Sequence, residues 1–109
     1  MASPNVLEFS QDNWSEHVSS GTLIVADFWA PWCGPCRALA PVVDRVADQF
    51  AGKVKVGKVN VDENGDLAVK YDVSTIPRIL MFKGGEQAVW EHVGTISDAA
   101  LAKEITARM

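Results

Sequence analysis

Residues 22–29 read Thr-Leu-Ile-Val-Ala-Asp-Phe-Trp, a run that after Thr22 is apolar at both alternating sets of positions except at Asp27. Alternate residues of a strand point to opposite faces of a sheet, so this run predicts a strand that is covered on both sides. Sheets covered on both faces occur in α/β layer folds, where helices pack against each side. We therefore expect residues 22–29 to form a central strand of such a sheet.

Strand-like and helix-like segments alternate along the rest of the chain. Further strands are expected at Val6–Phe9, Lys53–Val61, Arg78–Phe82 and Gln87–Val93, and helices at residues 10–19, Cys33–Phe50, residues 64–71 and from Ser97 onward. Gly84-Gly85 suits the turn of a hairpin between the last two strands, while right-handed crossovers make the earlier strands parallel. The pattern predicts one mixed five-stranded sheet, with three parallel strands and an antiparallel hairpin, flanked by four helices.

Length and composition set further limits on the function. The chain has 109 residues, 48% of them hydrophobic, which suits a single domain over residues 1–109 with residues 1–5 as a loose tail. A net charge of -4 argues against nucleic acids and anionic membranes as general partners. No run approaches the roughly 20 apolar residues of a membrane span, and Met1–Asn5 does not resemble a signal peptide. These features favour a cytoplasmic protein.

Cys33 and Cys36 are the only two cysteines, and only Gly34-Pro35 separates them. They lie where the predicted central strand gives way to the long helix. Side chains three residues apart on a helix are neighbours, so the two sulfurs can form and break a disulfide with little backbone movement. In a reducing compartment such a pair is more often catalytic or metal-binding than a structural cross-link.

The position of the pair predicts different roles for its two thiols. At the start of the helix, the Cys33 sulfur would lie at the positive end of the helix dipole and near the N–H of Cys36, so we expect a lowered pKa for Cys33. Cys33 would then attack the disulfide of a partner, and Cys36 would attack Cys33 to release the reduced partner. Gly34 offers a surface without a side chain, and Pro35 stiffens the loop.

Two other readings of the cysteine pair remain open at this point, a static disulfide and half of a zinc site. Tetrahedral zinc sites need four ligands. The other candidate ligands are His17 and His92, which lie far apart in the sequence and lack the usual ligand spacing. The sequence therefore predicts no metal site.

Asp27 and Lys58 are charged residues within predicted strands. A carboxyl group buried in a covered strand should have a raised pKa, which suits a proton acceptor that activates Cys36 through water. The alternative is that Asp27 lies at an open, solvated end of the strand. Lys58 is either the charge partner of Asp27 or an ordinary surface lysine. The predicted catalytic set is Cys33, Cys36, Asp27 and Lys58.

The run Trp32-Cys33-Gly34-Pro35-Cys36 resembles the active-site motif of the thioredoxin family. Other segments match that family in order and spacing: Asp27–Ala30, Pro41, Lys58–Asp62, Ile76-Pro77 and Val93-Gly94. The resemblance extends from about Val6 to Arg108. It implies the thioredoxin fold and a monomeric protein-disulfide reductase that acts on disulfide-containing client proteins.

The resemblance also bears on cofactors and on the surface around the cysteines. It implies that no cofactor is bound, and that electrons come from NADPH through a flavin-dependent thioredoxin reductase. Members of the family carry a cis proline beside the cysteine pair, which implies a cis bond before Pro77. A substrate-binding rim around Cys33 is then expected from Trp32, Val61, Thr75, Ile76, Pro77, Val93 and Gly94. For Trp32 the alternative is a place in the core.

Two positions depart from the family pattern, Thr75 and Arg78, where the family usually has a small residue and a threonine. Arg78 could point away from the site, or add positive potential that favours acidic partners. The alternatives in function are a thiol oxidase or isomerase with the same fold, or a binding subunit without catalysis. Gly34-Pro35 between the cysteines favours the reductant.

Overall fold

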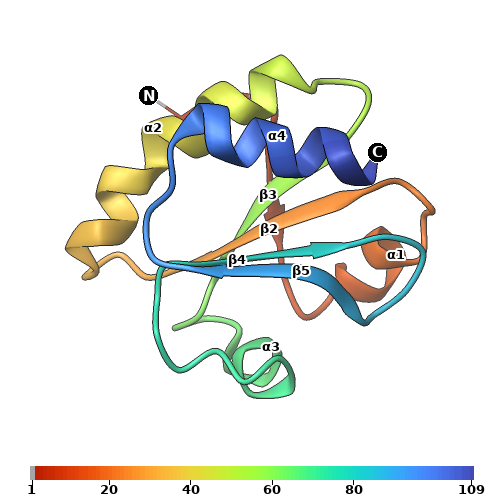
Figure 1. The fold of residues 1–109 in the computed structure, drawn as a ribbon. Helices are drawn as coiled ribbons and strands as arrows, with labels where there is room; N and C mark the ends of the chain where they lie inside the picture. The colour runs from red at the N-terminus through yellow and green to blue at the C-terminus, as the bar shows by residue number, and fades with distance from the viewer. Residues whose placement is uncertain (1) are drawn as a thin grey trace.

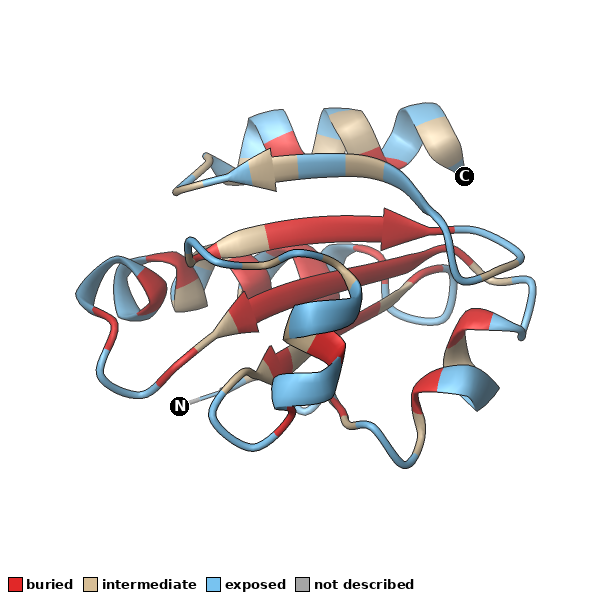
Figure 2. Ribbon diagram, turned by 90° about the horizontal axis from the view of Figure 1, so that it is seen from below, coloured by how far each residue is buried: buried red, intermediate tan, exposed pale blue. Residues whose placement is uncertain are grey.

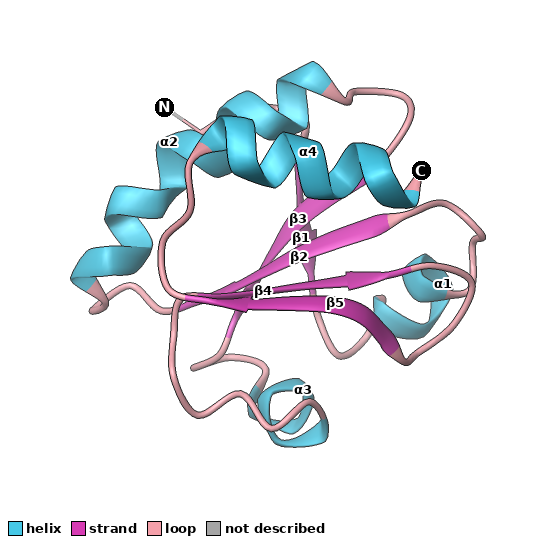
Figure 3. Ribbon diagram, in the orientation of Figure 1, coloured by secondary structure: helices cyan, strands magenta, loops and turns pink. Residues whose placement is uncertain are grey.

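A computed structural model describes residues 2–109, and Met1 lies outside the described residues. Nine elements follow one another along the chain: β1 (Val6–Phe9), α1 (Trp14–Val18), β2 (Ile24–Trp29), α2 (Gly34–Gln49), β3 (Lys55–Asn60), α3 (Gly65–Lys70), β4 (Arg78–Phe82), β5 (Ala88–Val93) and α4 (Asp98–Arg108). Figure 3 shows them by type. Their order is the one that the alternation of patterns predicts.

The strands form one mixed sheet in the order β1-β3-β2-β4-β5. β3 is parallel to β1 and β2, while β4 is antiparallel to both β2 and β5. Helices α2 and α4 lie on one face of the sheet, and α1 and α3 lie on the other (Figure 1). The predicted α/β fold, with three parallel strands and a terminal hairpin, is confirmed.

β2 is the central strand, and it is buried from Ile24 to Phe28 (Figure 2). Val25 on one of its faces belongs to an apolar cluster with α2 and α4 residues such as Leu39 and Leu101. Ile24, Ala26 and Phe28 belong to a second cluster with α1. Because β2 packs against helices on both sides, its sequence had to be apolar at both sets of positions.

Gly57 explains how β1 can lie so close to β3. A Cβ atom at this position would lie 2.6 Å from the ring of Phe9 and 2.7 Å from the Leu7 carbonyl oxygen. The Phe9 ring is fully buried and closely packed, so it could not move aside without disturbing the core. Glycine at this position therefore lets the edge strand pair with the rest of the sheet.

Local boundaries differ most from the sequence-based expectations at α1 and at the connection between β4 and β5. α1 begins at Trp14, because residues 11–13 form a turn in which Asn13 Oδ1 accepts a bond from the Ser10 N–H at 2.8 Å. The connection between β4 and β5 spans residues 83–87, longer than a two-residue turn. Gly84 has a φ of +75°, a left-handed conformation that glycine adopts without strain.

The segment before β1 is attached to α2 from Ser3 onward. The Ser3 N–H donates to Asp44 Oδ1 at 3.1 Å, and the Ser3 hydroxyl and the Asn5 side chain both donate to Asp48. The expectation of a loose tail over residues 1–5 therefore does not describe Ser3 and Asn5. From residue 2 to residue 109, none of the helices combines the length and the apolar character that crossing a bilayer requires.

Candidate functional site

The cysteine pair lies at the junction of β2 and α2. Cys33 is the N-cap residue of α2, and its N–H donates to the Ala30 carbonyl at 3.1 Å. Cys33 Sγ accepts a hydrogen bond from the Cys36 N–H at 3.2 Å. The two residues form a disulfide, with their Cα atoms 5.3 Å apart. Pro35 occupies the first turn of the helix, where its missing N–H costs nothing.

The surroundings of the pair are apolar. Cys33 is 5% exposed and Cys36 is 2% exposed, and the partly buried side chains of Trp29, Val61 and Ile76 pack against them. Cys33, the N-cap residue, is slightly more exposed than Cys36, which lies within the first turn of α2. Two of the predicted rim residues, Val61 and Ile76, are thereby placed directly at the disulfide.

Trp32 is exposed and does not belong to the core. It is 68% exposed, and its indole Nε1 lies 3.1 and 3.2 Å from the two carboxylate oxygens of Asp62. The bond to Asp62 ties the ring to the segment that follows β3. Sequence reasoning did not assign a role to Asp62, although it lies within the matching segment Lys58–Asp62.

The loop before β4 faces the disulfide. The peptide bond between Ile76 and Pro77 is cis, as the family resemblance implied, and the Ile76 carbonyl oxygen lies 3.9 Å from Cys33 Sγ. The Gly94 N–H donates to the Pro77 carbonyl at 2.8 Å. This bond brings the exposed Val93 next to the loop, and Thr75 is exposed in the loop itself.

Asp27 is a buried carboxyl group without a hydrogen-bond partner among the described residues. It is 1% exposed, and burial raises its pKa to about 7, while the positive charge of Lys58 opposes this effect. It alternates along β2 with residues of the second cluster and therefore faces α2. The carboxyl group thus lies on the side of the sheet that α2 covers, and Cys36 is in the first turn of that helix.

Lys58 is directly opposite Asp27 in the β2–β3 register, and Glu8 is opposite Lys58 in the β1–β3 register. The Lys58 ammonium group lies 5.2 Å from the centroid of the Trp29 ring. It also lines a hollow of about 230 Å³ with Trp29, Asn60 and Glu63. Lys58 therefore influences Asp27 through space, while its side chain is held over an aromatic ring.

Arg78 points away from the cysteine pair. Its Nη1 atom donates to the Asp72 carbonyl at 3.0 Å and to Glu91 Oε2 at 3.2 Å. The expectation that Arg78 could add positive potential at Cys33 therefore receives no support from its position. Nothing in the sequence indicated Asp72 or Glu91 as its partners.

The two histidines lie apart from the cysteines and have other contacts. His17 packs edge-on against Phe9 and lies 3.3 Å from the Lys55 ammonium group. His92 is stacked on Trp90. The part of the chain from residue 2 onward contains no group of three or more His, Cys, Asp or Glu residues arranged to hold a metal ion.

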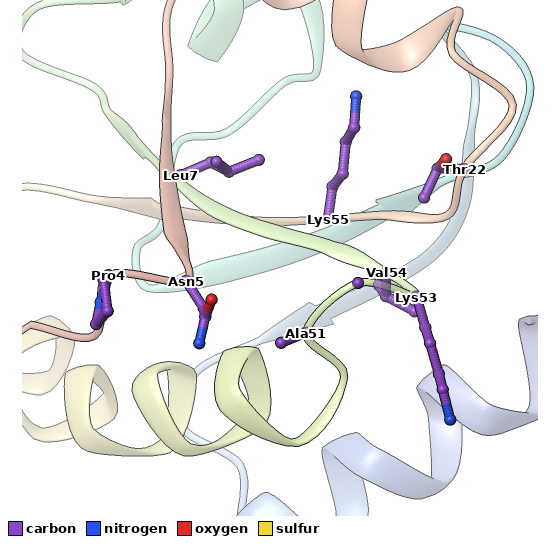
Figure 4. A pocket seen from close by; sticks show the side chains of 9 residues that line it. Pro4, Asn5, Leu7, Thr22, Ala51, Lys53, Val54 and Lys55 are labelled. Atoms are coloured by element: carbon purple, nitrogen blue, oxygen red, sulfur yellow. The ribbon is translucent and has the colours of Figure 1, made fainter.

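A second hollow, of about 320 Å³, lies at the other end of the sheet, near the first residues of β3. Its lining includes Thr22, Lys53 and Lys55. Figure 4 shows the two lysine side chains pointing in opposite directions, so that they do not converge on a common ligand. This hollow does not contribute to the site around the disulfide.

The comparisons with known proteins agree with this geometry. The thioredoxin family model matches residues 5–107. Thioredoxin 1 of Nostoc sp. is 48% identical over 90 residues, 83% of each chain. A chloroplastic M-type thioredoxin of Pisum sativum is 42% identical over 97 residues, 88% of this chain and 56% of the relative. The structure of a mutant thioredoxin from Halobacterium salinarum, 38% identical, superposes with a TM-score of 0.85 over 98% of this chain and 94% of its own.

Proposed function

This chain belongs to the thioredoxin family and is a protein dithiol–disulfide oxidoreductase, and we propose that it serves as a general electron donor to disulfide-containing proteins. The observation that carries this proposal is the disulfide at the start of α2, where the Cys36 N–H donates to Cys33 Sγ. In the reduced protein, the same N–H and the helix dipole would stabilise a Cys33 thiolate. That thiolate is the nucleophile that disulfide exchange needs.

The first step of the proposed reaction is attack by Cys33 on a client disulfide. A bond forms between Cys33 Sγ and one client sulfur, the client S–S bond breaks, and the second client sulfur leaves as a thiolate that takes up a proton. Cys33 is suited to this step because its sulfur accepts the Cys36 N–H bond and lies beside the Ile76 carbonyl, in the docking surface proposed below. The product is a mixed disulfide between Cys33 and the client.

The second step is attack by Cys36 on Cys33. Asp27, buried on the same side of the sheet, would accept the Cys36 proton through water. The bond between Cys36 and Cys33 then forms, and the first client sulfur leaves as a thiolate. Two electrons have passed to the client, which is reduced, and the Cys33–Cys36 disulfide is restored.

Client docking is proposed on the exposed surface around Cys33. Trp32 and Val93 are large exposed apolar residues, and Ile76 packs against the disulfide itself. An extended client segment could pair with the Ile76 backbone as an added strand, while Thr75 and Gly94 border it. Pro77, whose carbonyl accepts a bond from the Gly94 N–H, holds this loop in place.

Thioredoxins need no bound cofactor, so the oxidised pair has to be reduced by another protein. We propose a flavin-dependent thioredoxin reductase that draws electrons from NADPH. A cytoplasmic location and a monomeric state are part of the same proposal, supported by the lone cysteine pair and by a docking surface that a client must be able to reach. Cell fractionation and light scattering would test them, and a plastid location would agree with the chloroplastic name of the pea relative.

Trapping with Cys36→Ser tests the proposed function directly. Without the second thiol, the mixed disulfide cannot be resolved, so we expect stable complexes with client proteins that dithiothreitol releases. Cys33→Ser is the matched control, and it should trap nothing because the remaining thiol is buried behind the first turn. If Cys33→Ser trapped client proteins through Cys36 and Cys36→Ser trapped none, the assignment of Cys33 as the attacking sulfur would be wrong.

A further inference from the structure

Resting on the proposed function, we propose that Arg78 is a positioning residue for client docking. It is the first residue of β4, and it follows the cis bond that faces Cys33. Its side chain joins the loop of residues 72–77 to the β4–β5 hairpin. These two segments carry Ile76 and Val93, two of the docking residues around the disulfide.

The contacts of Arg78 define the link. One guanidinium nitrogen, Nη1, lies 3.0 Å from the Asp72 carbonyl oxygen and 3.2 Å from Glu91 Oε2. The Arg78 side chain is 14% exposed and that of Glu91 is 47% exposed, so the guanidinium end of the ion pair is sheltered while the carboxylate end faces solvent. Hydrogen bonds with a charged donor are stronger than neutral ones. Arg78 thus fixes the start of the loop to β5, the strand that ends at Val93.

The loop has few other attachments. The Val73 N–H donates to the Ala68 carbonyl at 2.8 Å, and the Pro77 carbonyl accepts from Gly94 at 2.8 Å. Within residues 2–109, the N–H groups of residues 74–76 donate to no backbone acceptor. Asp72 has a φ of +53°, which is uncommon for a residue other than glycine. The bond from Arg78 to the Asp72 carbonyl stabilises this conformation at the point where the loop begins.

Arg78 acts through the loop and does not touch the sulfurs. Along β4 it alternates with Ile79, so it lies on the same face as Leu80 and Phe82, which pack with α1 residues. The cysteine pair begins α2, on the opposite face. A client therefore contacts Ile76 and not Arg78. Arg78 acts by restraining the loop that carries Ile76.

Replacing Arg78 by Met tests the proposal, because Met keeps the apolar stem and removes both hydrogen bonds. Loss of about 1 kcal/mol of preorganisation corresponds to about a fivefold weaker interaction. With dithiothreitol as the regenerating reductant, we expect the KM for insulin disulfides to rise about fivefold and kcat to stay within about twofold. The rate constant for oxidised glutathione, which has no extended client segment to pair with the Ile76 backbone, should not change. Arg78→Lys, which keeps the charge, should recover part of the loss.

Two controls separate docking from stability. Arg45→Met removes another arginine ion pair, which joins α2 to Asp98 of α4 and has no partner in the loop of residues 72–77, and it should leave the KM for insulin unchanged. Amide hydrogen exchange of Val73 and Gly94 should become faster in Arg78→Met and stay unchanged in Arg45→Met. Glu91→Gln should give an intermediate KM, because it keeps an acceptor but loses the charge.

The insulin assay distinguishes failure of the Arg78 proposal from failure of the proposed reductase function. If the unmodified protein does not reduce insulin, the proposed function is wrong, and the proposed role of Arg78 is then wrong as well. If it does reduce insulin and Arg78→Met has the same KM, the positioning role is wrong while the reductase stands. An equal loss with insulin and with oxidised glutathione would also overturn the proposal, because it would indicate a change at the sulfurs themselves.

Discussion

The burial of the Asp27 carboxyl group is unfavourable for the fold, and in the proposed mechanism it is useful for the reaction. Both oxygens are buried without a hydrogen-bond partner in the described part of the chain, and the pKa of about 7 follows from that burial. A carboxyl group with a pKa near neutrality can both accept and return a proton under working conditions. We interpret this residue as the proton acceptor for Cys36.

Asp27→Ala should slow release of the mixed disulfide without slowing its formation. The reason is that only the second step needs the Cys36 proton to be removed. Stopped-flow measurement of both steps, with Asp12→Ala as a control at an exposed position, would check this. A reduction of about tenfold or more in the release rate is expected, which lies below the usual range for full acid–base catalysis because water can replace the carboxylate in part. Equal release rates in the two variants would remove Asp27 from the mechanism.

At the scale of elements, the helices of this chain begin in different ways. Cys33 caps α2 with a sulfur, and Ser97 caps α4 with a hydroxyl that accepts from the Ala100 N–H at 3.1 Å. Asn64 precedes α3 without a side-chain bond to it, because its amide instead joins Gln11 and Asn60. The cap of α2 is thus the one that also takes part in the chemistry.

Ser97→Ala should destabilise the protein by about 1 kcal/mol, the usual cost of removing a helix cap. α4 covers one face of the sheet through the buried residues Leu101 and Ile105, so the loss should appear in global unfolding. Urea denaturation of the oxidised protein measures it. Ser97→Asp should keep the stability, since a carboxylate can accept the same bond, and equal losses in both variants would contradict the capping role.

The elements show which boundaries local sequence can predict. α4 begins where Ser97 indicated, because a cap depends on residues only three positions apart. α1 begins later than Ser10 suggested, because Ser10 and Asn13 bond to each other in a preceding turn. A side chain that can either cap a helix or form a hydrogen bond within a turn does not fix the helix start by itself. The start then depends on the rest of the structure.

At the scale of the whole molecule, Asp27 makes the stability depend on pH. Its pKa is raised from 3.8 to about 7 in the folded protein. Well below pH 3.8 the carboxyl group is protonated in both states. As the pH rises, the unfolded chain releases the proton first, so the free energy of unfolding falls until the folded form has also ionised.

We therefore expect the oxidised protein to lose stability between about pH 4 and pH 8, by up to about 4 kcal/mol if this group acts alone. Asp27→Ala should remove most of this slope and should be more stable than the parent at about pH 8, because no charge is then buried. Urea denaturation across the pH range, with Asp12→Ala as the control, measures both. An unchanged slope in Asp27→Ala would show that other groups cause the pH dependence.

Local patterns determined much of this protein: a two-sided central strand, the order of the elements, the cysteine pair and the burial of Asp27. These depend on periodicity and on residues close together in the chain. Only the tertiary structure decided that Lys58 lies over Trp29, that Asp62 holds Trp32, and that Arg78 joins Asp72 to Glu91. Each of these contacts joins separate strands or loops. The residues in each contact become neighbours only when the sheet has formed. A long, flexible, charged side chain can then reach several possible partners, so the sequence alone does not identify the one that it contacts.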